Sequence, residues 1–187
     1  MSYFSDEEFD ELATTLRVAL GVDEQVYLDV IYALKRMKHC GYIVDYVRVP
    51  DAMMLDDEGK FDPDQRKIFF RNSVFVGAEQ KKERARFTVA HEMAHSALNH
   101  QQIRKRSLSA ATFEKAVTSI RRDEVQANKL AGAILAPFRH SNFSIKTTPP
   151  DLVDRFGLSS VRQPNASKSW LGYFDAATTS RVPSHPG

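Results

Sequence analysis

Two histidines four residues apart, His91 and His95, and the glutamate beside the first, Glu92, are the residues of this chain best suited to chemistry. On an α-helix of 3.6 residues per turn, positions 91 and 95 lie one turn apart on one face, so both imidazoles can reach a single metal ion. Imidazole nitrogen is a common zinc ligand, and a carboxylate next to the metal can act as a general base. The His-Glu-x-x-His spacing therefore predicts a zinc site suited to peptide hydrolysis.

A hydrolytic zinc site needs a third protein ligand and an open position for water, and the residues after the motif narrow the choice. In the metzincin pattern a glycine and a third histidine would stand at positions 98 and 101, where this chain has Leu98 and Gln101. That class is excluded. His100 is a further candidate, but a continued helix would point its side chain away from the metal.

Glu124 is the favoured third ligand. Asn128 follows one helical turn later on the same face, so the pair offers a carboxylate for the metal and an amide that can hydrogen-bond a ligand histidine. Asp123 is adjacent, but it would point about 100° around the helix from Glu124. The alternative for Glu124 is a plain role near a helix N-terminus, where the macrodipole favours acidic residues.

Helices and a small sheet must position these side chains. Apolar residues at helical spacing predict a helix over Glu7–Leu20 that ends at Gly21, and a second helix from an N-cap at Asp23 to Gly41. The second helix would carry an apolar stripe made of Val26, Val30, Leu34 and Met37. Runs rich in β-branched and aromatic residues at 42–49, 67–70 and 74–76 predict a sheet of about three strands, with Phe61 in a loop or on a short edge strand.

The motif itself lies in a predicted helix over Lys81–Asn99, and a strong helical pattern over Arg122–Ala136 ends at Pro137. A weaker helical stretch is expected at 103–119. The fold class is therefore α+β and mostly helical. We expect a main domain at 1–146, a small helical appendage at 147–175 after a proline-rich linker, and a disordered tail at 176–187.

Length and composition limit the classes of function. The 187 residues suffice for one domain with a real core, and a net charge of +2 indicates no global attraction to nucleic acid. Short basic runs at 81–82, 104–106 and 121–122 are typical of solvated surfaces, so DNA binding is only weakly supported. Cys40 is the sole cysteine, which excludes an intrachain disulfide and fits a reducing cytoplasm. No signal peptide or membrane span is visible.

Two longer segments make the comparison with known proteins specific. The residues 86–95, RFTVAHEMAH, followed by 124–131, EVQANKLA, and an apolar run to Pro137, resemble the ImmA/IrrE family of zinc metallopeptidases. The resemblance covers roughly residues 28–137 and includes the strand KIFFR at 67–71. Gln126 stands where many members have a second glutamate, and Leu130 where they usually have phenylalanine. The segment 152–171 is similar, more weakly, to the helix-turn-helix-like region of some members.

The resemblance implies a zincin-like domain in which His91, His95 and Glu124 bind Zn²⁺ and Glu92 is the catalytic base. It also implies an intracellular endopeptidase that cuts a transcriptional repressor at a specific site, in mobile-element or stress control. The oxyanion donor stays open among four residues, namely Tyr42, Tyr46, His100 and His140. Two alternatives remain: a non-proteolytic regulator of the same fold that binds DNA or a protein partner with a structural zinc, and a helical interaction protein without metal. The oligomeric state cannot be predicted.

Overall fold

A computed structural model of the chain describes residues 4–99, 110–137 and 155–156. Its elements are α1 (Asp6–Leu20), α2 (Val30–His39), β1 (Asp45–Val49), the 3-10 turn η1 (Asp51–Met53), β2 (Gly59–Asp62), β3 (Lys67–Arg71), α3 (Asn72–Glu79), α4 (Glu83–Ala97) and α5 (Ala110–Leu135). Helices dominate and the strands form one small sheet, which confirms the α+β class. The predicted appendage at 147–175 and tail at 176–187 lie, apart from residues 155 and 156, outside the described residues, so the division into domains stays a prediction.

Helix α1 begins and ends where local chemistry dictates. The Ser5 hydroxyl accepts the Glu8 backbone N–H at 3.2 Å, and the Glu8 carboxylate accepts the Ser5 backbone N–H at 2.6 Å, which forms a capping box. Gly21 ends the helix in the left-handed region at φ 65°, a conformation that favours glycine. The first predicted helix is confirmed.

Helix α2 starts later than predicted. Its N-cap is Asp29 rather than Asp23, because the Asp29 carboxylate accepts the backbone N–H groups of Ile31 and Tyr32 at 3.0 and 2.9 Å. Val26 consequently falls outside the helix and is 55% exposed. The remaining members of the predicted stripe, Val30, Leu34 and Met37, are buried in the core.

The sheet has three strands in the order β1-β3-β2, with β1 parallel and β2 antiparallel to the central β3. The strand predicted at 42–49 is confirmed as the shorter β1, and the strand predicted at 67–70 is confirmed as β3, which is one residue longer. The strand predicted at 74–76 is wrong, since those residues lie in α3. The third strand is instead β2, which places Phe61, 4% exposed, on an edge strand.

Helix α3 forms because its apolar residues face the core at helical spacing and a distant carboxylate caps it. Val74, Phe75 and Ala78 are buried. The N-cap, Arg71, makes no side-chain cap, but Asp51 of η1 accepts the Ser73 backbone N–H at 2.9 Å. The amide at the start of the helix thus finds its partner 22 residues back along the chain.

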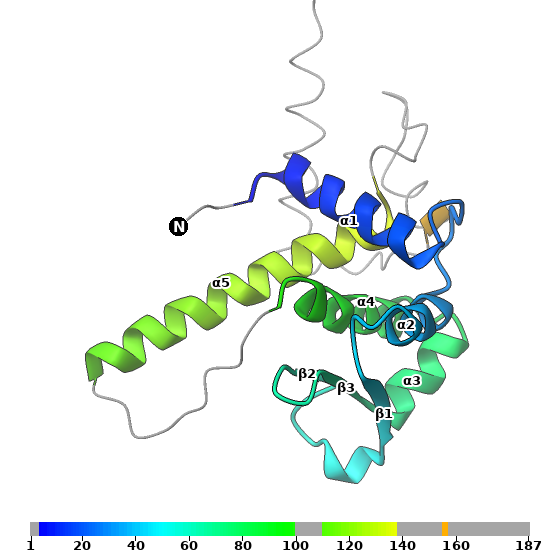
Figure 1. Cartoon of the computed structure of the whole chain (residues 1–187). Coiled ribbons are helices and arrows are strands. Elements are labelled where there is room, and N and C mark those ends of the chain that lie inside the picture. Colours follow the sequence, from blue (N-terminus) through cyan, green and yellow to red (C-terminus); the bar gives the residue numbers. More distant parts are fainter. Residues whose placement is uncertain (1–3, 100–109, 138–154, 157–187) are drawn as a thin grey trace, which may run out of the picture.

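Helix α4 lies at the centre of the molecule (Figure 1), with α5 and α1 on one side and the sheet with α3 on the other. The buried residues of α4 and α5 that form this centre are Val89, Ala90, Met93, Ala94, Ala127, Leu130, Ala131 and Ile134. Small alanines on both helices allow their backbones to approach closely. The helix predicted over 81–99 is confirmed as Glu83–Ala97, and it packs against α5 on one side and against β2 on the other.

The third large helix differs from the prediction in one respect. The separate stretches expected at 103–119 and 122–136 belong, from Ala110 onward, to the single helix α5, which ends two residues before Pro137. The buried guanidinium of Arg17 in α1 donates to the Ile134 carbonyl at the end of α5, at 2.8 Å. This hydrogen bond satisfies a terminal carbonyl of α5 and ties α1 to it.

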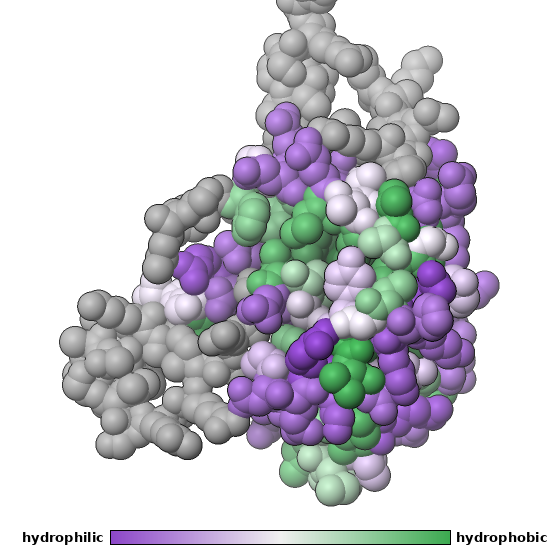
Figure 2. Space-filling model, viewed as in Figure 1, coloured by the Kyte–Doolittle hydropathy of each residue, from purple (hydrophilic) through white to green (hydrophobic). Residues whose placement is uncertain are grey.

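Most of the surface shown in Figure 2 is hydrophilic, with apolar side chains in separate patches. One patch, at the lower end of the view, covers the η1 turn and the residues after it, where Met53 and Leu55 are 76% and 77% exposed. In the described part of the chain, none of the helices combines the length and the apolar character needed to span a bilayer.

Candidate metal centre

Three side chains that can bind a metal converge between α4 and α5. His91 and His95 project from one face of α4, one turn apart, and Glu124 approaches them from α5. Both imidazoles are mostly buried, with 16% and 13% of the side chains exposed, while Glu124 is 51% exposed. The group therefore has a protein side and a side open to solvent.

The distances within this group fit a single zinc ion. Nε2 of His91 lies 3.0 Å from Nε2 of His95, and the Glu124 carboxylate oxygens lie 3.2 Å and 3.4 Å from these two nitrogens. Ligand atoms about 2.0–2.1 Å from a tetrahedral metal are separated by roughly 3.3–3.4 Å. Two neutral imidazoles and one carboxylate are also a donor set that zinc accepts in hydrolytic sites. The residues thus fit the metal that the motif predicts.

Asn128 of α5 orients one of the two imidazoles. Its Oδ1 lies 3.0 Å from Nδ1 of His91. Since an amide oxygen only accepts, Nδ1 must carry a proton, so in the neutral imidazole Nε2 is the nitrogen that can bind a metal ion. Phe87, one turn earlier on α4, contacts the same ring with a centroid distance of 6.3 Å. The imidazole is therefore held in the tautomer and orientation that metal binding requires.

The charges of the site favour a ligating carboxylate. Hydrogen bonds with His91 and His95 hold the pKa of Glu124 far below its usual range, so this side chain stays ionised at neutral pH. Burial acts to lower the pKa of His91, but hydrogen bonding to Glu124 and the nearby carboxylates outweigh it and raise that pKa. The shifts of His91 and Glu124 thus both favour positive charge at the point where these two side chains meet.

Glu92 occupies a separate, dry position beside this group. It is 6% exposed, and burial raises the pKa of its carboxyl. Hydrogen bonding from the backbone N–H of Phe61 in β2 acts the other way and lowers the same pKa. Glu92 therefore points toward the sheet side of α4, next to the histidines but not among the three converging ligands.

The structure places the predicted site residues as follows. His91, His95, Glu124 and Asn128 come together; Asp123 instead lies 3.4 Å from Arg122. His100 and His140 lie outside the described residues. Of the candidate oxyanion donors, Tyr46 stacks on Phe75 at the sheet edge away from β2, with a centroid distance of 5.8 Å, and Tyr42 is 37% exposed at the chain segment before β1. Neither placement supports an oxyanion role.

Sequence reasoning missed the contribution of β2. The stretch 56–60 has the composition of a turn, and that composition alone indicates no role for Glu58 or Gly59 in the site. In the structure Gly59 packs directly against the Glu92 side chain. A signal was present in the spacing of Arg84, Thr88 and Glu92, which repeats every four residues and marks a second polar face of α4.

The helix-borne histidine pair, the glutamate from the next helix and the buried carboxylate together have the form of a metallopeptidase centre. A comparison with protein families bears on the same point. The model of the peptidase M78 family, described as an IrrE N-terminal-like domain, matches residues 47–160. This match covers more than half of the chain, which therefore belongs to that family, and the ImmA/IrrE resemblance is confirmed. No curated protein and no solved structure matched the chain.

Proposed function

We propose that this chain is a zinc-dependent endopeptidase in which His91, His95 and Glu124 bind the metal and Glu92 is the general base. The observation that carries the proposal is the convergence of His91, His95 and Glu124, whose contacting nitrogen and oxygen atoms lie 3.0–3.4 Å apart, next to a buried carboxylate. Membership of a peptidase family supports the reaction class.

The protein side chains divide the work of peptide hydrolysis. When bound, zinc supplies a Lewis acid that polarises the peptide carbonyl and makes water a stronger nucleophile near neutral pH. Glu92 accepts the proton of the attacking water and delivers it to the leaving amine. Asn128 keeps His91 in its ligating tautomer, and Glu124 provides the negative charge of the ligand set.

The substrate we propose is a transcriptional repressor or regulator, cut at a specific site in mobile-element or stress control, in the cytoplasm. The ImmA/IrrE resemblance supports this substrate class. Cys40, an exposed free thiol, fits a reducing compartment. The competing function is a regulator of the same fold that uses zinc structurally and binds DNA or a protein partner. A structural zinc site has no need of a general base, and the buried Glu92 therefore favours the peptidase.

Co-expression with the regulator encoded beside this gene tests the proposal. Wild type should yield a discrete cleavage product of the regulator, identified by intact-mass spectrometry, and Glu92→Gln should yield none while it retains zinc. Glu79→Gln is the matched control, because Glu79 is an exposed glutamate at the end of α3. Cleavage that persists in Glu92→Gln would refute the role of Glu92, and binding of the regulator without cleavage by wild type would favour the regulatory function.

A further inference from the structure

Helix α4 has a second polar face besides the one that carries the histidines. Arg84, Thr88 and Glu92 follow one another at four-residue spacing and therefore lie in one row along the helix. This row faces β2 and the residues before it, which contact α4. The general base of the proposed reaction thus belongs to the face of α4 that packs on the sheet.

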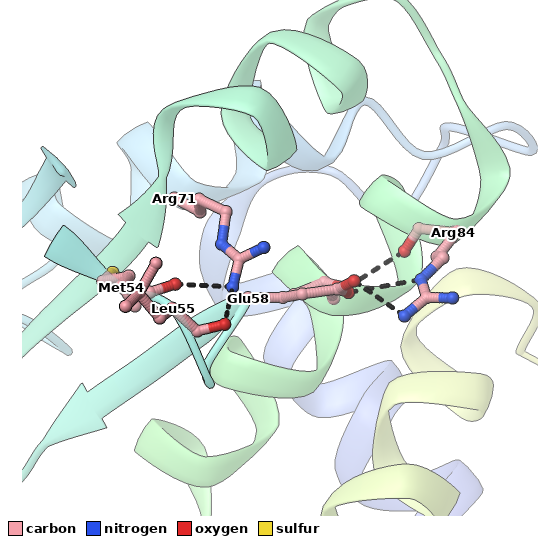
Figure 3. Close-up of polar contacts among 6 residues, drawn as sticks. Met54, Leu55, Glu58, Arg71 and Arg84 are labelled. Carbon is pink, nitrogen blue, oxygen red and sulfur yellow. Dashed lines mark hydrogen bonds and ion pairs between the residues drawn. The ribbon is translucent and has the colours of Figure 1, made fainter. Parts of the chain in front are cut away.

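Glu58, the residue before β2, is held by the other two members of this row. Its Oε1 lies 2.7 Å from Nη2 of Arg84, and its Oε2 lies 3.3 Å from Nε of Arg84 and 3.2 Å from Oγ1 of Thr88. Figure 3 shows the Glu58 carboxylate directed at the Arg84 guanidinium. We call this group, Glu58 with Arg84 and Thr88, the Glu58 clamp. A two-pronged contact of this kind fixes direction as well as distance.

The main chain around Glu58 is held as well. The backbone N–H of Arg71, the last residue of β3, donates to the Glu58 carbonyl at 3.1 Å. On the other side of Glu58 in Figure 3, the Arg71 guanidinium donates to the carbonyls of Met54 and Leu55. The chain that leads into β2 is therefore anchored to β3 by its backbone and to α4 by the Glu58 side chain.

Directly after the Glu58 clamp, Gly59 and Phe61 meet the Glu92 side chain. A Cβ added at Gly59 would lie 2.7 Å from Cγ of Glu92 and 3.2 Å from both Cδ and Oε1. Glycine is required here for close approach, since any side chain would overlap with Glu92. The Phe61 backbone N–H lies close enough to the Glu92 carboxylate to act on its charge. We call Gly59 and Phe61 the β2 cradle.

We propose that the β2 cradle holds the Glu92 carboxylate in its reactive place, and that the Glu58 clamp sets the separation of β2 from α4 on which the cradle depends. Glu58 and Gly59 are thus positioning residues for the general base. The proposal rests on the proposed peptidase function.

Because the Glu58 clamp is exposed, its loss should affect the geometry of the site more than the stability of the fold. Arg84 and Glu58 are 76% and 36% exposed as side chains, and an exposed ion pair of this kind adds little to folding. Reaction rate is far more sensitive to geometry, because a displacement of about 1 Å at a reacting group can cost about 100-fold. Loss of the clamp should therefore lower kcat while the protein stays folded.

Gly59→Ala tests the cradle, with Lys60→Ala as the matched control, because Lys60 is the exposed neighbour on the same strand. In the zinc-loaded protein we expect Gly59→Ala to lower kcat by about 10- to 100-fold, with KM and zinc content within about twofold of wild type. Lys60→Ala should keep wild-type kcat. An unchanged kcat in Gly59→Ala would overturn the proposal.

Glu58→Ala and Glu58→Gln test the clamp. Glu58→Ala should lower kcat by about 3- to 10-fold at unchanged KM, and Glu58→Gln should recover part of that loss, because one amide oxygen can still accept from Nε of Arg84 and Oγ1 of Thr88. Equal losses in the two variants, or a loss confined to KM, would contradict a positioning role.

Amide hydrogen exchange gives a readout that does not depend on activity. In folded, zinc-loaded Gly59→Ala, the Phe61 amide should exchange about fivefold faster than in wild type, the effect of losing one ordinary hydrogen bond. An unchanged exchange rate of the Phe61 amide in Gly59→Ala would refute the β2 cradle, even if the wild-type protein cuts the regulator. If wild type cuts no substrate but the Phe61 amide responds as expected, the proposed function fails and the cradle stands.

Discussion

Asn128→Ala should weaken zinc binding without removing any ligand. Asn128 contributes one contact to the centre, a hydrogen bond of 3.0 Å to Nδ1 of His91. Loss of such an outer partner costs about 10- to 100-fold in metal affinity, or about 1.4–2.7 kcal/mol. The His91 side chain is 16% exposed, so a water molecule can replace part of the lost acceptor. We therefore expect a loss of affinity near the lower limit, about tenfold.

Competition against a chromogenic zinc chelator measures this change in the dissociation constant. Val125→Ala is the control, because Val125 lies on the same helix with 53% of its surface exposed. Asn128→Asp keeps an oxygen acceptor and should stay within about threefold of wild type. Affinity of Asn128→Ala within twofold of wild type, or an equal loss in Val125→Ala, would refute the assignment of Asn128 as the residue that orients His91.

Two further predictions concern the fold that positions the site. Met93→Ala should lower the free energy of unfolding by about 2–5 kcal/mol, because Met93 is fully buried next to Glu92. The control Met53→Ala, at a 76% exposed position, should change it by less than about 0.5 kcal/mol. Urea unfolding measures both, and equal effects would contradict the packing of α4. Asp29→Ala should lower the free energy of unfolding by about 1 kcal/mol, because the α2 cap is lost. Glu24→Ala, at an exposed position, should have little effect. Thermal melts compare the two variants, and no difference between them would mean that Asp29 is not the cap.

The parts of the fold that sequence predicted well depend on local chemistry. Helix α1 carries its capping box and its terminal Gly21 within the chain segment itself. In the same way the motif residues His91 and His95 define both a helix and a face of that helix. Residues four apart on a helix meet whatever surrounds them, so these contacts can be derived from spacing alone.

The start of α2 was misplaced among local cap candidates, whereas two other errors arise where a distant residue decides the outcome. The run at 74–76 has high β propensity, yet it forms a helix because Asp51 caps Ser73 and the core buries Val74 and Phe75. Gly59 lies in a stretch with the composition of a turn. Only its contact with Glu92, 33 positions later in the printed sequence, shows why glycine stands there. Contacts of this kind leave no periodic pattern in one sequence.

Zinc content tests the central claim most directly. Wild type purified without chelators should contain about one equivalent of zinc, His91→Ala and Glu124→Ala should contain less than about half an equivalent, and Glu92→Gln should match wild type, since it alters the base and no ligand. Atomic emission spectroscopy on the four proteins, each shown to be folded by circular dichroism, measures these contents. Less than about half an equivalent in wild type, or full zinc in Glu124→Ala, would contradict a metal centre built from His91, His95 and Glu124.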